Sequence, residues 1–473
     1  MTNLDLVIVF GYLGLMVGLG IYASRKQRNI EDYFVAGRRL GAFSIACLWL
    51  ASWVGGASIV GGAAKAHDIG VSAIWYVLSL SLGCAVFGLF FAARVKELGD
   101  RHRDLTYPDF IERHYDSRTR IVSTLTTSLA FLAFAAGQLV AAASIIEVLL
   151  NWEFAHALLL AGGIVIVYTA TGGFLAVTYT DWVQFVLLLL GVVVVGIPIA
   201  ISQGGSPAQL HAQLPRDFFQ IGAWGWGTIF ALIVSIGLSF VVAMDSFTRC
   251  FAARSQRVAR SGAIMAAVFM LPIALAATWL GMTSAVLFPD VQNSNGILTL
   301  FVVELFPPGL KGLVLVGILA AVMSTADICI LTVSANLTRD VYQRYLNPEV
   351  SATKLLRLSV IASVVAGVTA LGMAWKMQDI IAILLFGFTL NSAALFLPTV
   401  MAMNHRRLQP SAAFWSILCS LLIVMAWRLC AEAGFGGIFA IEPLWPGLLV
   451  SILTIVIMSA RQGGAPPPRL RSN

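Results

Sequence analysis

The sequence contains long apolar runs, and these restrict the fold more than any other feature. About 20 consecutive apolar residues are the length that one α-helix needs to cross the hydrocarbon core of a bilayer. Inside lipid, a helix pairs its own backbone N–H and C=O groups, which an open strand cannot do. Thirteen such runs can be marked, at about 5–24, 42–64, 71–94, 121–150, 155–173, 179–201, 226–248, 261–288, 311–335, 355–375, 378–402, 411–431 and 442–460. The sequence therefore predicts an all-α integral membrane protein with about 13 transmembrane helices.

The composition agrees with a lipid environment and excludes several function classes. Of the 473 residues, 59% are apolar and only 11% are charged, whereas a water-soluble domain carries about 25% charged residues. The net charge of +7 does not indicate a nucleic-acid partner, because the basic residues stand in groups between the apolar runs rather than along one face. The cysteines and histidines show no zinc-ligand spacing, and no nucleophile and base cluster together, so we do not expect an enzyme.

The distribution of basic residues orients the chain, because Lys and Arg concentrate in cytoplasmic loops. With the N-terminus outside, all but five of the 30 Lys and Arg residues lie on the cytoplasmic side; the exceptions are Lys65, Arg216, Lys311, Lys376 and Arg428. The opposite orientation would invert this ratio, so the sequence predicts an N-out, C-in topology. We expect residues 1–460 to form one transmembrane domain and the Pro-rich residues 461–473 to form a disordered cytoplasmic tail.

Two of the apolar runs are interrupted by small and polar residues. The second run contains Gly55 and Gly56, and the seventh reads S-I-G-L-S-F-V-V-A-M-D at 235–245. The glycines could serve close helix packing, or they could mark a broken helix whose freed backbone groups line a binding cavity. The second and seventh runs would open two five-helix halves, spans 2–6 (42–201) and spans 7–11 (226–402), which is the arrangement that an inverted repeat predicts.

The ninth run carries hydroxyl groups and a carboxyl group in otherwise apolar surroundings. Ala321, Ser324 and Thr325 stand at positions i, i+3 and i+4, and therefore lie on one helical face. Such oxygens suit a hard monovalent cation, although Ser and Thr hydroxyls can instead bond back to their own helix. Carboxylates inside a membrane are expensive and indicate function. Asp327 lies deep in this run, whereas Asp181 and Asp245 could instead be interfacial residues paired with Arg or a helix end.

Several motifs together resemble the sodium/solute symporter family. The segment N-I-E-D-Y-F-V-A-G-R-R-L-G (29–41) resembles the signature of its first cytoplasmic loop. Y-T-A-T-G-G-F-L-A-V-T-Y-T-D-W-V-Q (168–184) is similar to its connection between spans five and six. A-A-V-M-S-T-A-D (320–327) and N-L-T-R-D-V-Y (336–342) resemble its ninth span. The resemblance extends from the first span to about the eleventh, and the family's thirteen-helix, N-out topology agrees with the count above.

The resemblance implies a LeuT-type fold and assigns site residues by position. The main sodium site would use carbonyls of the broken helix and one face of the ninth span: Ala51, Val54, Ala321, Ser324 and Thr325. A second ion site would use Ser52, Asp181 and Asp327, although the apolar Ile328 departs from the family pattern. The substrate-binding positions would be Trp53, Gly55, Gly56, Ser58, Ser239 and Phe240.

These observations predict a secondary active transporter of the plasma membrane. We expect Na⁺-coupled symport of a small organic solute by alternating access, with the lipid bilayer as the surroundings. The predicted pocket is poor in amides, which favours an amino acid or a carboxylate over a sugar, and the free N–H groups of a broken helix favour anions. Two alternatives stay open: a solute sensor on a transporter scaffold, for which no output domain follows the last span, and proton-coupled rather than sodium-coupled symport.

Overall fold

The computed structural model describes residues 2–24, 38–104, 106–404 and 408–461, and these residues form helices and no strand. The N-terminal half contains α1 (Asn3–Ser24), α3 (Ala42–Trp53), α4 (Gly56–Ile69), η2 (Gly70–Ala73), α5 (Ile74–Phe90), α6 (Ala92–His102), α7 (Tyr107–His114), α8 (Ser117–Leu150), α9 (Phe154–Leu188), η3 (Leu189–Gly196), α10 (Ile197–Ser202), α11 (Pro207–Gln213) and η4 (Arg216–Phe219). The C-terminal half contains α12 (Trp226–Val242), α13 (Met244–Ala252), α14 (Gln256–Leu287), η5 (Ser294–Gly296), α15 (Ile297–Leu305), α16 (Leu310–Ala335), η6 (Asn336–Leu346), α17 (Ala352–Lys376), α18 (Ile380–Met403), α19 (Pro410–Glu432), η7 (Gly437–Ala440) and α20 (Leu444–Arg461). The predicted disordered tail lies, apart from Arg461, outside the described residues.

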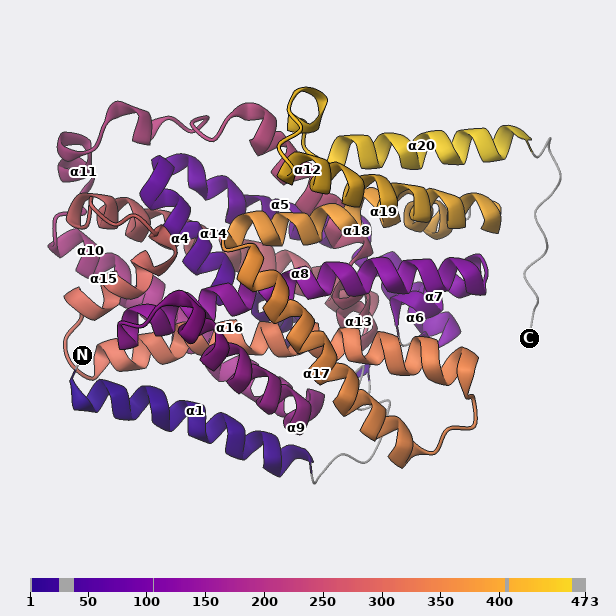
Figure 1. The fold of residues 1–473 in the computed structure, drawn as a ribbon, viewed down its shortest axis with the longest axis horizontal. Coiled ribbons are helices and arrows are strands. Elements are labelled where there is room, and N and C mark those ends of the chain that lie inside the picture. Colours follow the sequence, from indigo (N-terminus) through magenta and orange to yellow (C-terminus); the bar gives the residue numbers. More distant parts are fainter. Residues whose placement is uncertain (1, 25–37, 105, 405–407, 462–473) are drawn as a thin grey trace.

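The helices form one bundle, with α8 and α16 at its centre (Figure 1). Within the described ranges, seven helices are long and apolar enough to cross a membrane, and counting each of two bent helix pairs as one span brings this number to nine. In the most apolar stretch of α16 with η6, 94% of the residues are buried, and 89% are buried in α8, against 28% in α17. The outer face of α17 instead exposes aliphatic side chains such as Ile361 and Val365. The polar and small residues of the ninth predicted span are therefore in the interior of the bundle, and α17 carries none of the residues of the site.

The two interrupted runs are broken helices, as the sequence predicts. α3 ends at Trp53, and Val54 has non-helical dihedral angles (φ −108°, ψ 50°) before α4 begins at Gly56. α12 and α13 are separated by the extended residue Ala243 (φ −63°, ψ 134°) and are bent by 49°. Each break leaves backbone groups without helical partners in the middle of the bundle, which membrane proteins tolerate only away from lipid.

The predicted connection between spans 155–173 and 179–201 falls inside α9, which is helical from Phe154 to Leu188 and is followed by the π-helical η3 and by α10. The contacts on either side of this connection show that the chain reverses direction. Ile166 packs against Gly367, and Thr169 reaches Asp327 in the second half of α16. Leu187 instead packs against Gly317 in the first half of α16, so the two predicted spans run in opposite directions.

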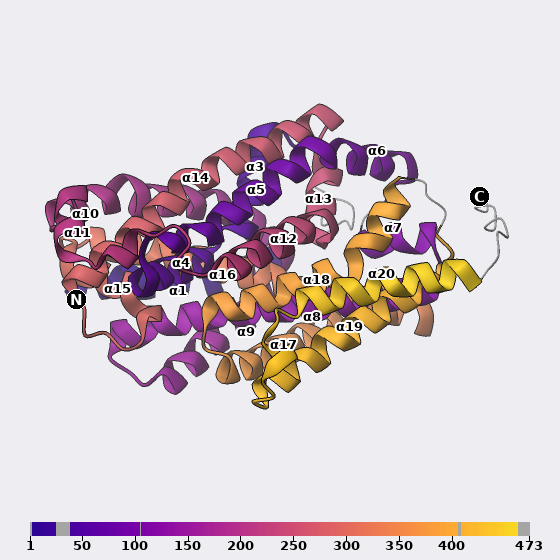
Figure 2. The same cartoon turned by 90° about the horizontal axis from the view of Figure 1, so that it is seen from above.

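The two ends of the bundle are held by different contacts (Figures 1 and 2). At the end that carries α6, α7, α13 and η6, which we call the basic end, the Leu40 amide donates a hydrogen bond to the Ala252 carbonyl over 3.1 Å. Lys96 of α6 donates to the Phe251 carbonyl of α13 over 3.2 Å. At the opposite end, which carries α11, η4 and α15, Ser72 donates to the Ile221 carbonyl over 2.9 Å. The broken helices thus connect the two ends through the centre of the bundle.

Candidate functional site

The predicted cation ligands converge where α3 ends against α16. Thr325 Oγ1 lies 2.9 Å from the Ala51 carbonyl oxygen and 3.0 Å from the Ala321 carbonyl oxygen. Ser324 Oγ lies 3.2 Å from the same Ala321 oxygen. The Ala51 and Ala321 carbonyl oxygens and the Ser324 and Thr325 hydroxyl oxygens therefore form an oxygen-rich cluster between the two helices. Thr325 has one hydroxyl hydrogen for its two carbonyl neighbours, so it can donate to only one of them at a time. The hydrogen bonds to Ala321 lie within α16 and are the alternative that the sequence analysis left open for Ser and Thr hydroxyls. The contact of Thr325 with Ala51 joins two separate helices, and this alternative does not account for it.

Close approach of the two helices depends on Gly55 and Gly56. A Cβ atom on Gly55 would lie 2.3 Å from Thr325 Oγ1. A Cβ atom on Gly56 would lie 2.2 Å from Val322 Cγ2 and 2.7 Å from the Ile318 carbonyl oxygen. Both glycines therefore pack against α16, and neither of them lines the cavity beside the break. Val54, the remaining predicted ligand, is buried at the break itself.

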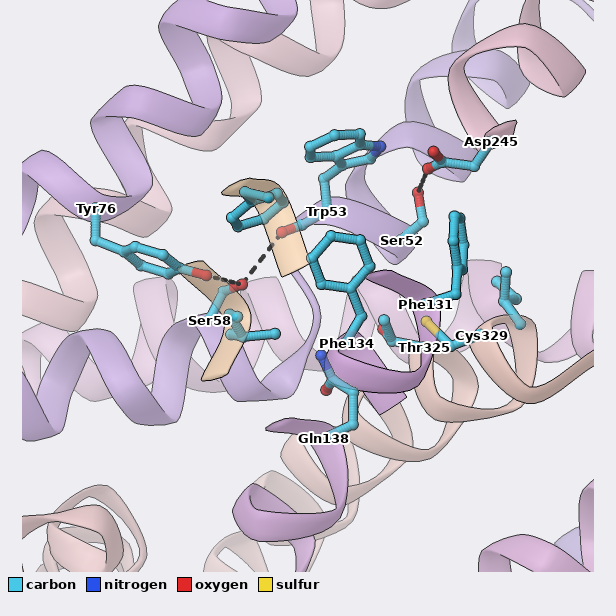
Figure 3. Close-up of a pocket in the computed structure, with 13 residues that line it drawn as sticks. Ser52, Trp53, Ser58, Tyr76, Phe131, Phe134, Gln138, Asp245, Thr325 and Cys329 are labelled. Atoms are coloured by element: carbon cyan, nitrogen blue, oxygen red, sulfur yellow. Dashed lines mark hydrogen bonds between the residues drawn. The ribbon is translucent and has the colours of Figure 1, made fainter. Parts of the chain in front are cut away.

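A small cavity of about 30 Å³ adjoins the oxygen cluster (Figure 3). Its walls are Ser52, Trp53, Ser58, Tyr76, Phe131, Phe134, Gln138, Asp245, Thr325, Ile328, Cys329, Leu384 and Phe388. Of the predicted substrate positions, Trp53 and Ser58 line it. Ser239 and Phe240 are buried but do not line it; the Phe240 ring stacks on the Trp53 ring with centroids 3.5 Å apart. Phe240 therefore supports the cavity wall from behind.

Sequence reasoning missed two polar groups of the cavity. Gln138 of α8 accepts a hydrogen bond from the Ala57 amide over 3.2 Å and has its Nε2 near Gly55. The Tyr76 hydroxyl of α5 lies 3.5 Å from Ser58 Oγ, which also donates to the Trp53 carbonyl over 3.2 Å. The only available signal for Gln138 was a lone amide inside the apolar run 121–150. The cavity thus contains an amide, and its predicted poverty in amides no longer argues against a sugar.

Asp245 lines the same cavity from the start of α13. Its Oδ2 accepts a hydrogen bond from Ser52 over 3.2 Å and lies 3.7 Å from Arg249 Nη1. Arg249 Nε donates to the Leu48 carbonyl over 2.9 Å, and Nη1 donates to the Asp245 carbonyl over 3.1 Å. Asp245 is therefore a buried residue that joins α3 to α13, the halves of the two broken helices at the basic end, and it lies beside an Arg as the sequence analysis allowed.

Ser52 and Asp327, two residues of the predicted second ion site, contact different partners. The Ser52 hydroxyl faces Asp245, as described above. Asp327 is fully buried, and the Thr169 hydroxyl of α9 donates to its Oδ1. The side chain of Asp181 lies outside the described residues. Within the described part of the chain, no contact joins Ser52 to Asp327.

Comparison with known proteins places this architecture among transporters. The model of the sodium:solute symporter family matches residues 33–420. The sodium/proline symporter of Escherichia coli (strain K12) is 26% identical over 469 residues, which are 96% of this chain and 91% of the relative. The sodium/proline symporter of Staphylococcus aureus (strain JH9) is 25% identical over 470 residues, with 96% and 92% covered.

Solved structures of symporters share the fold. A Na⁺-coupled sialic acid symporter in a substrate-bound outward-open state superposes with a TM-score of 0.79 at 21% identity, covering 99% of each chain. Mhp1, a nucleobase-cation-symport-1 family transporter in a closed conformation, superposes with a TM-score of 0.58 at 17% identity, covering 92% of this chain and 96% of its own. The family match covers most of the chain, so the protein belongs to the sodium:solute symporter family and is a multi-pass plasma-membrane transporter, not an enzyme, that couples a small solute to Na⁺.

Proposed function

We propose that the protein imports an amino acid or a carboxylate together with Na⁺ by alternating access through the cavity beside Trp53. The observation that carries the proposal is the contact of Thr325 with Ala51, because it brings oxygen atoms of α16 and of the broken helix together next to the cavity, which supports a cation site there. We assign Na⁺ to Ala51, Val54, Ala321, Ser324 and Thr325. A cation there would hold α3 against α16.

Coupling follows from the position of this cluster. Ser52 and Trp53 line the cavity directly after Ala51, so a cation that orders the end of α3 also orders one wall of the solute site. By linkage, each ligand then raises the affinity of the other by the same factor. The inward Na⁺ gradient and the membrane potential, which supplies about 2.3 kcal/mol per charge per 100 mV, drive solute import.

The solute class is argued from the outer half of the broken helix. The amino terminus of α4, a helix of 14 residues, begins at the cavity, and its amides carry partial positive charge that favours a carboxylate. The two relatives named above are called sodium/proline symporters, and proline is a carboxylate-bearing amino acid. Both points favour an amino acid or a carboxylate, and neither depends on the pocket being poor in amides.

Solute entry requires the bundle to open. The cavity of about 30 Å³ has room for about two water molecules and not for an amino acid. On the side of the opposite end, α4 packs against α18, where a Cβ atom on Gly61 would lie 3.0 Å from Ile380 Cγ2. On the side of the basic end, Arg249 joins α13 to the Leu48 carbonyl of α3. We propose that these two contacts open in alternation.

We also propose thirteen crossings, with the N-terminus outside and the basic end in the cytoplasm. α9, η3 and α10 contain 35, 8 and 6 residues. As an ideal helix they would rise about 70 Å, more than twice the hydrocarbon thickness of about 30 Å. This run therefore has the length of spans five and six. The domain 1–460 then contains repeats at 42–201 and 226–402, each opening with a broken helix.

Transport assays with purified protein test the proposal. The protein is reconstituted in proteoliposomes, and uptake of radiolabelled amino acids, carboxylates and sugars is measured with an inward Na⁺ gradient, with K⁺ in place of Na⁺, and with a pH gradient alone. We expect Na⁺-dependent uptake of an amino acid or a carboxylate. Uptake driven by the pH gradient without Na⁺ would instead show proton coupling, and Na⁺-dependent uptake of sugars alone would contradict the proposed solute class.

A further inference from the structure

We propose that Asp245 selects the solute by accepting its ammonium group, so that the transported solute is a zwitterionic amino acid rather than a simple carboxylate. The inference rests on the proposed function and adds to it the recognised group and the residue that recognises it. Among the described residues, Asp245 is the one acidic side chain that lines the cavity. A carboxylate is placed in such an interior at a high cost, which a bound cation offsets.

Asp245 lines the cavity, and its described side-chain contacts use only one of its two carboxylate oxygens. Both of its side-chain contacts in the described part of the chain use Oδ2, with Ser52 at 3.2 Å and Arg249 at 3.7 Å. The second distance is too long for a direct hydrogen bond. Arg249 directs Nε and Nη1 to backbone carbonyl oxygens instead. Arg249 therefore lies beside Asp245, and its contact with the carboxylate is made to Oδ2.

The walls beside Asp245 suit a cation. The rings of Trp53, Phe134 and Phe388 form a continuous aromatic surface, with centroids 5.7 Å apart between Trp53 and Phe388 and 4.8 Å apart between Phe134 and Phe388. Aromatic faces attract ammonium groups within about 6 Å of the ring centroid. A carboxylate next to such a surface is the combination that recognises an amine.

The cavity has a second polar side with the opposite character. Figure 3 shows Asp245 and Ser52 on one side of the aromatic rings, and Ser58 with Tyr76 on the other side. The second side includes the amino terminus of α4, where the Ala57 amide donates to Gln138 Oε1. An anion is favoured at this helix terminus and a cation at Asp245. A solute with a carboxylate and an ammonium matches both sides.

Matched pairs of probes test the inference in proteoliposomes with an imposed Na⁺ gradient. The probes are amino acids and the acids that lack only the amino group, for example alanine with propionate and proline with cyclopentanecarboxylate. Glucose serves as the neutral probe. We expect Na⁺-dependent uptake of at least one amino acid, with its deaminated partner competing at least about hundredfold more weakly, because a buried carboxylate left unpaired rejects that analogue.

Variants of Asp245 separate recognition from a structural role. Asp245→Asn should raise the KM for the amino acid at least about tenfold and leave the Na⁺ concentration for half-maximal activation within about twofold. Asp245→Glu, which keeps the charge, should be milder. Asp68→Asn, which neutralises an exposed carboxylate bonded to Ser294, is the matched control and should behave like the parent protein.

A double variant addresses the alternative that Asp245 only neutralises Arg249. In that case Asp245→Asn combined with Arg249→Gln should restore the KM, whereas ammonium recognition predicts that the double variant stays impaired. The inference is overturned by a restored double variant, by an unchanged KM in Asp245→Asn, or by a deaminated acid or glucose that is transported as well as the amino acids. Na⁺-dependent transport of such an acid would leave the proposed function intact. Amino-acid uptake without Na⁺ would overturn the proposed coupling alone.

Discussion

At the scale of single residues, the proposed sodium site predicts the effect of removing the hydroxyl of Ser324 or of Thr325. Thr325→Ala removes the hydroxyl that lies between Ala51 and Ala321, and no neighbouring carbon atom can replace a cation ligand. We expect Thr325→Ala or Ser324→Ala to raise the Na⁺ concentration for half-maximal uptake at least about tenfold, equivalent to about 1.4 kcal/mol. Thr325→Ser should be much milder. Uptake at varied Na⁺ concentration measures the effect.

Thr369 provides the control for these hydroxyl deletions. It is exposed on α17, and its hydroxyl donates only to the Val365 carbonyl of its own helix among the described residues. Thr369→Ala should therefore leave the Na⁺ dependence unchanged. If Thr325→Ala and Ser324→Ala both behave like Thr369→Ala, their hydroxyls serve only as back-bonds and the assigned sodium site is wrong.

Asp327 is the second residue whose charge should affect transport. It is fully buried on α16, two residues after Thr325, and is bonded to Thr169. Asp327→Asn keeps the size of the side chain but removes the charge that would attract a cation or take up a proton. We expect the Na⁺ half-saturation to change by at least about threefold, or the uptake profile between about pH 5.5 and pH 8.5 to shift. Identical kinetics across this range would limit Asp327 to a structural role.

The structure brings together more of the residues predicted for the sodium site than of those predicted for the cavity walls. Ala321, Ser324 and Thr325 follow from helical spacing and from a family motif, both of which are local. Gln138 has no such pattern around it, because its contact with Ala57 joins residues 81 positions apart. The partner of Asp245 was equally hidden, since Ser52 is 193 positions away. Side chains from separate helices meet through packing, which spacing along one helix does not describe.

At the scale of elements, the two helix breaks were predictable from the sequence, and the helical backbone at the connection between spans 155–173 and 179–201 was not. Gly55 and Gly56 stand where α3 and α4 separate, and the predicted interruption at 235–245 contains the break at Ala243. A break at Gly55 is tolerated because it faces α16 and polar groups in the interior rather than lipid. The reversal of the chain between Thr169 and Leu187 lies inside α9, and only the contacts of these two residues with α16 reveal it.

The close contact of α4 with α16 predicts the effect of a single methyl group. In Gly56→Ala, the new Cβ atom would lie 2.7 Å from the Ile318 carbonyl oxygen and 2.8 Å from the Val322 amide, and backbone atoms cannot rotate away. We expect a loss of about 1–3 kcal/mol of stability together with impaired uptake, measured by thermal unfolding in detergent and by transport. Gly237→Ala in α12 is the matched control, because no atom lies within 4 Å of its Cβ position. Equal stability of the two variants would contradict the tight α4–α16 packing.

At the scale of the whole molecule, the proposed topology makes opposite predictions for the two ends of the bundle. Ala208 is exposed on α11 at the opposite end, and Ala352 is exposed at the start of α17, beyond η6 at the basic end. Four of the six native cysteines are buried. Cys419 and Cys430 are partly exposed, so both are first replaced by serine. In intact cells, an impermeant maleimide should label Ala208→Cys and leave Ala352→Cys unlabelled. Lysis should make Ala352→Cys reactive, because basic loops are retained in the cytoplasm during insertion. The reverse pattern would show that the N-terminus is inside, and labelling of both positions in intact cells would contradict the assignment of the two ends to opposite sides of the membrane.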